Sequence, residues 1–182
     1  MSSPFFSVVI PTFNRASTIS DTLQSVSNQR FRDFEIIVVD DGSTDATCDI
    51  VRSFEAATLI QQTNSGPGAA RNTGVNAALG TYIAFLDSDD LWFPWTLETF
   101  SQLVQEYDFP AVISAAMMEF SDGASLSEVR RTPVVSVWFD DFLSAQSASD
   151  CFVGAGMTVV RKDIFNGAGG FTDAITNCED HD

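Results

Sequence analysis

Basic residues are scarce in this sequence, and so are cysteines and long apolar stretches. Nine lysines and arginines stand against 25 aspartates and glutamates in 182 residues, Lys162 is the only lysine, and the formal net charge at pH 7 is −16. Neutralising a phosphate backbone needs a basic stripe, so the composition excludes a general nucleic-acid binder and we expect no nucleic-acid partner. An acidic chain can still bind a phosphorylated small molecule when a divalent cation lies between the two.

The three cysteines, Cys48, Cys151 and Cys178, are widely spaced and form no CxxC pair. This pattern favours free thiols in a reducing compartment over a disulfide framework or a zinc site. No apolar run is long enough to span a bilayer, and the N-terminal run lacks a basic segment and is broken by Pro11 and Asn14. We therefore expect a cytoplasmic protein with no membrane segment in this chain.

Apolar runs rich in β-branched residues alternate with helical patterns over the first 92 residues. Strands are predicted at FFSVVIP, FEIIVVD, ATLIQQ and TYIAFLD, with helices between them. This alternation predicts an α/β fold with a Rossmann-like, mostly parallel sheet covered by helices on both faces. Ser17 is the expected N-cap of the first helix, and Ser43 or Thr44 that of the second.

The alternation weakens after residue 92. A helix is predicted at PWTLETFSQLVQEY and a strand at AVISAAMMEF, and DCFVGAGMTVVRKDIFNGAGGFTD predicts a strand, a short helix and a glycine turn. The chain has no internal repeat and no low-complexity linker, and its length suits one domain. We therefore expect a single domain over residues 1–182, with an irregular C-terminal part.

Polar clusters follow each of the first four predicted strands: PTFNR, DDGSTD, NSGPGAARN and DSDD. Ligands of open parallel sheets bind beyond the carboxyl ends of the strands, so four clusters at one edge outline a site. Taken singly, each cluster is also explained as a turn and a helix cap, with Asp89 or Asp90 capping the helix after DSDD. No G-x-G-x-x-G follows the first strand and no G-K-[ST] occurs, which argues against a dinucleotide fold and a P-loop.

Three carboxylates crowd the DSDD turn, and no basic residue lies near them in the sequence. A hard divalent cation relieves such repulsion most directly, and Mg²⁺ or Mn²⁺ held by one or two carboxylates completes its shell with phosphate oxygens. The turn therefore predicts a metal–diphosphate site. Asp40 and Asp41 could accept hydrogen bonds from a base or a ribose, and Arg71 suits phosphate oxygens, with a solvated arginine as the alternative.

The motifs VVIPTFNR, IIVVDDGSTD, NSGPGAARNTG, YIAFLDSDD and EDHD, in this order and spacing, resemble those of family 2 inverting glycosyltransferases, which have the GT-A fold. The resemblance covers nearly the whole chain. It implies metal-dependent inverting transfer of a sugar from a nucleoside-diphosphate sugar, by family habit UDP-linked, with Mn²⁺ or Mg²⁺ as cofactor. The implied acceptor is a hydroxyl of a glycan or glycolipid, in polysaccharide or glycoconjugate synthesis. Such an acceptor would allow a position peripheral to the membrane.

The resemblance also implies roles for individual residues. Residues 1–92 form the nucleotide-sugar half, and residues 93–182 the acceptor-side half. Asp89 is implied as the metal ligand and Asp180 as the general base. The residues implied in nucleotide binding are Pro11, Thr12, Asn14, Asp40, Asp41, Arg71, Asp87 and Ser88. The residues implied on the acceptor side are Gly154, Ala155, Gly156, Met157 and Glu179, and for residues 154–157 a core strand and a turn are an equal explanation.

Family members usually continue with a helix beyond the acidic motif, so we expect this chain to be truncated at its C-terminus. The alternative function is a catalytically silent nucleotide-sugar-binding module or an inactive fragment. A phosphoacceptor signalling domain is disfavoured, because the Asp pair follows the second strand and not the first, and Lys162 follows no fitting strand. A nucleotidyltransferase would need a glycine-rich basic loop near the N-terminus, which this sequence lacks.

Overall fold

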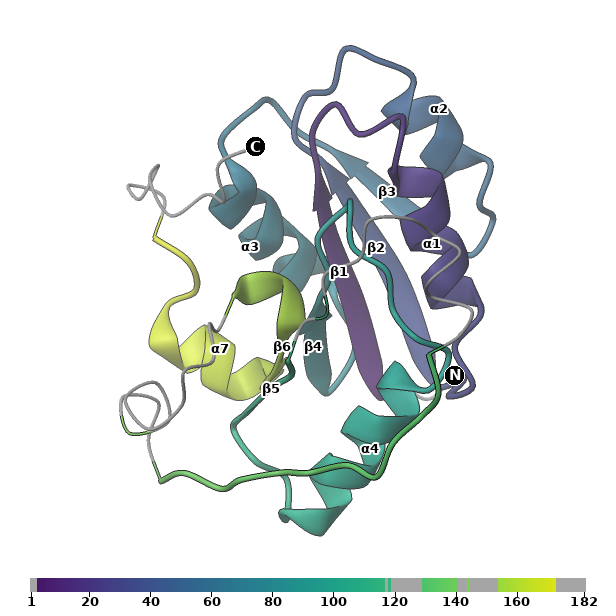
Figure 1. The fold of residues 1–182 in the computed structure, drawn as a ribbon. Helices are drawn as coiled ribbons and strands as arrows, with labels where there is room; N and C mark the ends of the chain where they lie inside the picture. The colour runs from purple at the N-terminus through teal and green to yellow at the C-terminus, as the bar shows by residue number, and fades with distance from the viewer. Residues whose placement is uncertain (1–2, 117, 119–128, 141–143, 145–153, 173–182) are drawn as a thin grey trace.

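Six strands form one sheet in the order β3-β2-β1-β4-β6-β5 (Figure 1). The computed structural model describes residues 3–116, 118, 129–140, 144 and 154–172. The strands are β1 (Phe6–Thr12), β2 (Phe34–Asp40), β3 (Ala57–Gln61), β4 (Tyr82–Phe85), β5 (Val112–Ser114) and β6 (Thr158–Arg161). The helices are α1 (Ile19–Ser27), α2 (Thr47–Arg52), α3 (Pro67–Ala77), α4 (Thr96–Glu106), the 3-10 turn η1 (Ala155–Met157) and α7 (Lys162–Ala168).

Strands β1 to β4 are parallel, and β1 lies between β2 and β4. Thr12, the last residue of β1, is in register with Asp40, the last residue of β2, so the carboxyl ends of these strands share one edge. Strand β6 runs antiparallel to both β4 and β5. The prediction of an α/β fold with a mostly parallel sheet is therefore confirmed.

Helices cover both faces of the sheet, and each face has its own hydrophobic core (Figure 1). On one face, α1, α2 and α4 pack against alternate residues of β1, such as Val8 and Ile10. On the other face, α3 and α7 pack against the residues between them, such as Val9. Because side chains alternate across a strand, this two-sided burial explains why the central strands are apolar at nearly every position.

Three predicted helix starts are wrong. Helix α1 follows Thr18 and not Ser17, and α2 follows Ala46 and not Ser43 or Thr44. Neither Asp89 nor Asp90 precedes α4, which begins at Thr96. For α2 the physical reason is that the side chains of Ser43 and Thr44 bond to Asn14 in the loop after β1, so they are not available as caps.

The strand predicted at residues 111–120 is confirmed only as β5, over three residues. Residues 115 and 116 are not in a strand, and 117, 119 and 120 lie outside the described residues. The predicted strand, short helix and glycine turn near the C-terminus correspond to β6, α7 and the left-handed residues Gly169 and Gly170. No helix in the described ranges combines the length and the apolar character that crossing a membrane requires.

Candidate functional site

The loop after β1 and the loop after β2 are joined by hydrogen bonds at the carboxyl-end edge of the sheet. The backbone N–H of Asn14 donates to Ser43 Oγ at 2.8 Å, and the backbone N–H of Thr44 donates to Asn14 Oδ1 at 2.8 Å. The N–H of Arg15 donates to Thr47 Oγ1 at 2.8 Å. These bonds use the side chains of Ser43 and Thr47 between loops and fix the backbone that carries Arg15.

Asp41 organises the loop that leads into α3. Its buried carboxylate accepts hydrogen bonds from Gln62 Nε2 at 2.8 Å, from Ser65 N–H at 2.9 Å and from Gly66 N–H at 2.8 Å. Gly66 has a φ of 88°, a left-handed conformation that favours glycine. A carboxylate has about four acceptor positions, so three internal bonds leave about one for a ligand.

Asp40 and Thr12, at the ends of β2 and β1, each have a buried oxygen atom that lacks a hydrogen-bond partner among the described residues. Asp40 Oδ2 accepts from the N–H of Ser43 at 3.2 Å. Asp40 Oδ1 and Thr12 Oγ1 are buried and have no hydrogen-bond partner within the part of the chain that the structure describes. Burial raises the pKa of the Cys48 thiol to about 11, and the neighbouring Asp40 carboxylate adds to this effect. Buried polar atoms without partners are costly, so this edge is suited to a ligand or water that would pair with them.

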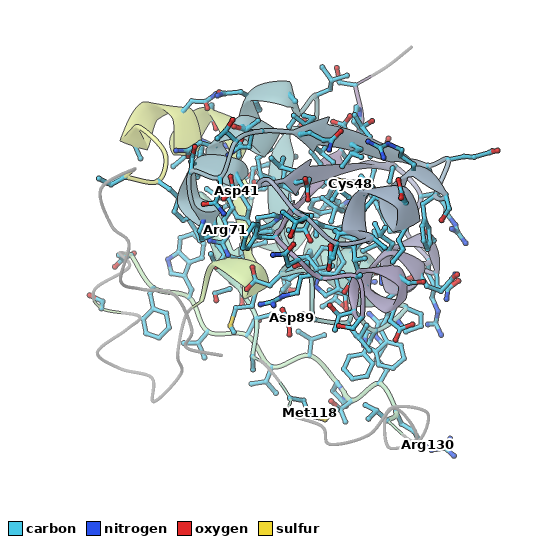
Figure 2. The ribbon with its side chains drawn as sticks, turned by 90° about the horizontal axis from the view of Figure 1, so that it is seen from above. Asp41, Cys48, Arg71, Asp89, Met118 and Arg130 are labelled. Carbon is cyan, nitrogen blue, oxygen red and sulfur yellow. The ribbon has the colours of Figure 1, made fainter. Side chains whose placement is uncertain are left out.

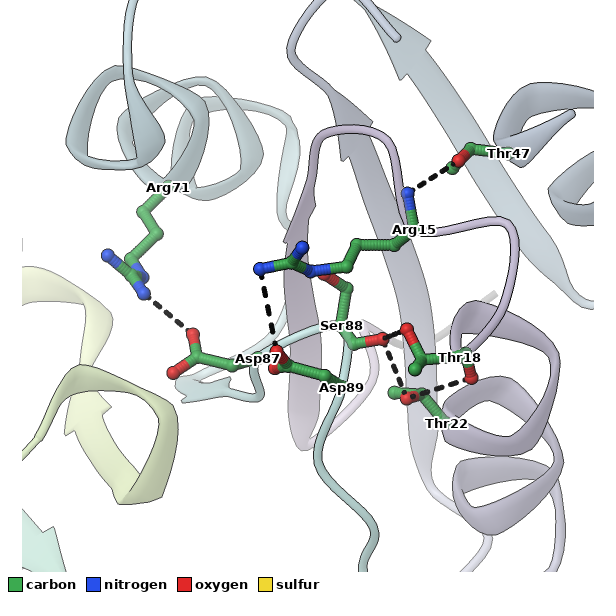
Figure 3. A network of polar contacts seen from close by, with 8 residues as sticks. All are labelled: Arg15, Thr18, Thr22, Thr47, Arg71, Asp87, Ser88 and Asp89. Atoms are coloured by element: carbon green, nitrogen blue, oxygen red, sulfur yellow. Dashed lines mark hydrogen bonds and ion pairs between the residues drawn. The ribbon is translucent and has the colours of Figure 1, made fainter. Parts of the chain in front are cut away.

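The turn after β4 is anchored to α1. The N–H of Asp90 donates to the carbonyl of Asp87 at 3.1 Å, which closes the turn. The carbonyl of Ser88 accepts from the hydroxyls of Thr18 and Thr22, both at 3.0 Å (Figure 3). These two hydrogen bonds fix the backbone of the turn that carries the Asp87 and Asp89 side chains.

Two arginines, one in the loop after β1 and one in α3, pair with the carboxylates of this turn (Figure 3). Arg71 Nη2 of α3 lies 2.6 Å from Asp87 Oδ1, and Arg15 Nη2 lies 3.5 Å from Asp89 Oδ2. The Arg71 and Asp87 side chains are 13% and 28% exposed, whereas Arg15 and Asp89 are 39% and 48% exposed. The crowding seen in the sequence is therefore relieved in part by arginines that are distant in the sequence.

The carboxylates of this turn fit a metal ion only when a ligand supplies further oxygen atoms. Within the described ranges no group of three or more His, Cys, Asp or Glu side chains could hold a metal ion. Mg²⁺ or Mn²⁺ bound with substrate phosphates needs one or two carboxylates. Asp89 fits this role, because it is half-exposed and its contact with Arg15 is longer than a hydrogen bond. Asp87 is already bonded to Arg71.

The segment predicted on the acceptor side lies against the Asp87 carboxylate. A Cβ placed on Gly156 would lie 2.6 Å from Asp87 Cγ, so η1 packs directly on this side chain. Ala155 and Met157 belong to the same turn, and the carbonyl of Gly154 accepts from Thr158 Oγ1 at 2.9 Å. Glu179 and Asp180, together with His181, lie outside the described residues.

Three residues at the site were not predicted. Arg15 stood in the PTFNR cluster, and its position beside Asn14 was the signal that could have identified it. Asn72 and Phe171 meet in space: the Asn72 amide bonds to both the N–H and the carbonyl of Phe171, each at 2.9 Å. In the view from above, Asp41, Arg71 and Asp89 lie toward the middle of the molecule (Figure 2).

A mixed six-stranded sheet with helices on both faces and these loops at its carboxyl-end edge defines an α/β protein with the GT-A glycosyltransferase fold. The profile of glycosyl transferase family 2 matches residues 7–167. The chain belongs to glycosyltransferase family 2.

Relatives and solved structures agree with this assignment. The chain is 36% identical over 177 residues to glycosyltransferase GlyG of Streptococcus pneumoniae, covering 90% of this chain and 59% of GlyG. It is 35% identical over 145 residues to TuaG of Bacillus subtilis, a glycosyltransferase named for teichuronic acid biosynthesis, covering 77% of this chain and 57% of TuaG. S. aureus TarS 1-349 in complex with UDP superposes with a TM-score of 0.76 at 25% identity, over 96% of this chain and 52% of that one. The chain thus spans less than two thirds of each of these proteins.

Proposed function

We propose that this protein transfers a sugar from a nucleoside-diphosphate sugar, with UDP as the favoured nucleotide, to a hydroxyl of a glycan or glycolipid acceptor, with inversion at the anomeric carbon. The observation that carries the proposal is the meeting of Asp41, Arg71, Asp87 and Asp89 at one sheet edge in a family 2 chain. TarS, at 25 to 27% identity, has been solved with UDP and with UDP-GlcNAc, which supports a UDP-sugar donor.

The proposed donor site is divided between the four loops. Thr12 and Asp41 would hold the nucleoside, because Thr12 Oγ1 is unpaired within the described residues and Asp41 keeps about one free acceptor position. Pro11, near the end of β1, and Asn14, Asp40 and Ser88, through the loop contacts described above, would complete this donor site. Asp87 would lie near the ribose and Arg71 near the diphosphate, whose oxygens suit a guanidinium.

Asp89 would hold Mn²⁺ or Mg²⁺ together with the diphosphate. The ion, when bound, would offset the negative charge that grows on the leaving diphosphate. During transfer, the acceptor oxygen bonds to the anomeric carbon while the bond from that carbon to the diphosphate oxygen breaks. Asp180 would take the hydroxyl proton from the side opposite the diphosphate, with Glu179 beside it.

The two halves of one catalytic domain, residues 1–92 and 93–182, would then bind donor and acceptor respectively. The alternative of a phosphoacceptor signalling domain, which needs a lysine beside its aspartates, is disfavoured by the position of Lys162. Lys162 Nζ donates to the carbonyl of Ala78, beyond the C-terminal end of α3, whereas Arg71 and Gly66 lie at the opposite, site-facing end of that helix.

The test is UDP binding by calorimetry with and without Mn²⁺. We expect Mn²⁺ to strengthen UDP binding in the wild-type protein and to have little effect in the Asp89→Ala variant, because the variant loses the carboxylate that holds the ion. Asp49→Ala is the matched control, since it removes an exposed carboxylate that pairs with Arg52 on α2. UDP affinity that is indifferent to both Mn²⁺ and Asp89→Ala would contradict the metal–diphosphate site.

The base assignment needs a separate measurement, the release of UDP from UDP-sugars. Asp180→Asn should abolish UDP release while leaving UDP binding intact, because an amide cannot accept the proton. Unchanged release in this variant would contradict the assignment. UDP binding by the wild-type protein without any release or transfer would instead favour the nucleotide-sugar-binding module.

A further inference from the structure

Asp87 is enclosed on both sides of its carboxylate. On one side Oδ1 accepts a 2.6 Å hydrogen bond from Arg71 Nη2. On the other side lies Gly156 of η1: a Cβ there would contact Asp87 Oδ2 and would lie 2.6 Å from Asp87 Cγ and 3.2 Å from its backbone nitrogen. Real Cβ atoms do not come this close to such neighbours, so only a glycine leaves the Asp87 carboxylate in its present position.

Arg71, in turn, is supported by an aromatic ring. Its guanidinium carbon lies 5.6 Å from the ring centre of Phe171, within the range of a cation–π contact. The Phe171 ring packs edge-on against Phe85 of β4, with centroids 5.5 Å apart, and against Phe165 of α7, also at 5.5 Å. The ring is therefore fixed by the core on one side of the sheet and presents its face to Arg71.

The backbone of Phe171 is held independently of its ring. The side-chain amide of Asn72 accepts from the Phe171 N–H and donates to the Phe171 carbonyl, both at 2.9 Å. Gly170, directly before, has a φ of 77°, and a Cβ there would lie 2.7 Å from Asn72 Oδ1. Replacing the Phe171 ring should therefore leave this turn in place, which makes the ring's effect on Arg71 testable by itself.

We propose that Gly156 and Phe171 are positioning residues for the donor site: Gly156 sets the place of the Asp87 carboxylate, and Phe171 sets the guanidinium of Arg71 that bonds to it. Both come from residues 93–182, whereas Arg71 and Asp87 come from residues 1–92. The consequence for donor binding rests on the proposed function. The coupling of Phe171 to Asp87 through Arg71 is a property of the protein alone and can be measured without a ligand.

The first experiment is a double-mutant cycle on the unfolding equilibrium constant, with Phe171→Leu and Asp87→Asn. These two side chains both contact Arg71, so we expect non-additivity on the order of fivefold, which disappears in an Arg71→Met background. Phe31→Leu combined with Asp87→Asn is the matched control and should be additive, because the Phe31 ring packs against Phe5 and Phe6 in the core on the other face of the sheet. Additive effects for Phe171→Leu and Asp87→Asn would overturn the proposal.

The second experiment measures UDP affinity in the presence of Mn²⁺. Phe171→Leu should weaken UDP binding roughly fivefold, whereas Phe171→Tyr should bind like the wild type because an aromatic face remains. Phe31→Leu, in the core on the other face of the sheet, should also bind like the wild type. Gly156→Ala should weaken binding, whereas Gly167→Ala, a helix position with open space around it, should not. Wild-type affinity in both Phe171→Leu and Gly156→Ala would overturn the positioning role.

The two experiments separate this proposal from the proposed function. A wild-type protein that binds no nucleotide contradicts the proposed function, and the unfolding cycle then decides the coupling by itself. If the wild-type protein binds UDP but the double-mutant cycle is additive, the proposed function is supported and the positioning role is contradicted.

Discussion

Asp87 and Asp89 are two positions apart and have different surroundings. Asp87 accepts a 2.6 Å hydrogen bond from a largely buried guanidinium, whereas Asp89 and Arg15 form a 3.5 Å ion pair that is open to solvent. A short charge-assisted hydrogen bond is stronger than an exposed ion pair. A cation should therefore displace Arg15 from Asp89 more readily than Arg71 from Asp87, in line with the proposed division between metal and ribose.

Cys48 should be a poorly reactive thiol. Burial, with Asp40 beside it, raises its pKa to about 11, and only the thiolate reacts with alkylating reagents. At pH 8 the thiolate fraction is then roughly a hundredfold lower than for a thiol with the ordinary pKa of 9.0. The measurement is the rate of iodoacetamide labelling in a Cys151→Ser/Cys178→Ser variant, which should rise steeply as the pH is raised toward 11.

The control for Cys48 is the same variant in denaturing urea, where the thiol should react as a free cysteine does. Equal labelling rates in the folded and unfolded protein at pH 8 would contradict the raised pKa.

At the scale of the elements, α3 carries much of the site. The loop before it bonds to Asp41, its first turns carry Arg71 and Asn72, and its middle packs on the sheet through Gly74. The distance of α3 from β1 and β2 therefore affects the position of Arg71. Gly74 sets this distance, because a Cβ there would contact a γ-methyl of Val9 and lie 3.3 Å from one of Val39.

Gly74→Ala should destabilise the protein. The added methyl forces α3 away from β1, and overpacking of this kind typically costs about 1–3 kcal/mol in the free energy of unfolding. Gly167→Ala in α7 is the matched control: nothing lies near its Cβ position, so the better helix propensity of Ala should add about 0.5–1 kcal/mol. Chemical denaturation measures both, and equal effects of the two substitutions would contradict the close packing at Gly74.

At the scale of the whole molecule, acidic residues far outnumber basic ones. The formal net charge is −16, and two of its few arginines, Arg15 and Arg71, lie at the turn after β4. Because 25 acidic residues stand against nine basic ones, like charges repel one another at low ionic strength. At the turn after β4, Arg15 and Arg71 offset the charges of Asp89 and Asp87, whereas Asp40 and Asp41 leave this sheet edge acidic, like the chain as a whole.

Added salt should raise the thermal midpoint of the ligand-free protein. The Debye length falls from about 30 Å at 0.01 M to about 8 Å at 0.15 M ionic strength, which screens the long-range repulsion more than the short Arg71–Asp87 contact. Thermal unfolding in NaCl and in KCl measures this, and the two salts should act alike if screening is the cause. A midpoint that falls with salt would show that local ion pairs outweigh the net charge.

Residue patterns alone predict the alternation of strands and helices, the sheet edge at which the polar clusters meet, and the family motifs. These features are readable because strand burial, turns and strand ends depend on residues close together in the chain. Parallel strands place their carboxyl ends at a shared edge, so the strand pattern is enough to predict that Asp41 and Asp87 lie at the same edge of the sheet.

The partners of these carboxylates, in contrast, depend on the tertiary structure. Strand order and helix placement bring Arg15 and Arg71 to the turn after β4, and the antiparallel β6 brings Gly156 against Asp87. The predicted cap at Ser43 was wrong for a related reason, since Ser43 bonds to Asn14 in another loop. Contacts between residues far apart in the chain depend on the packing of whole elements, which no local pattern of residues specifies.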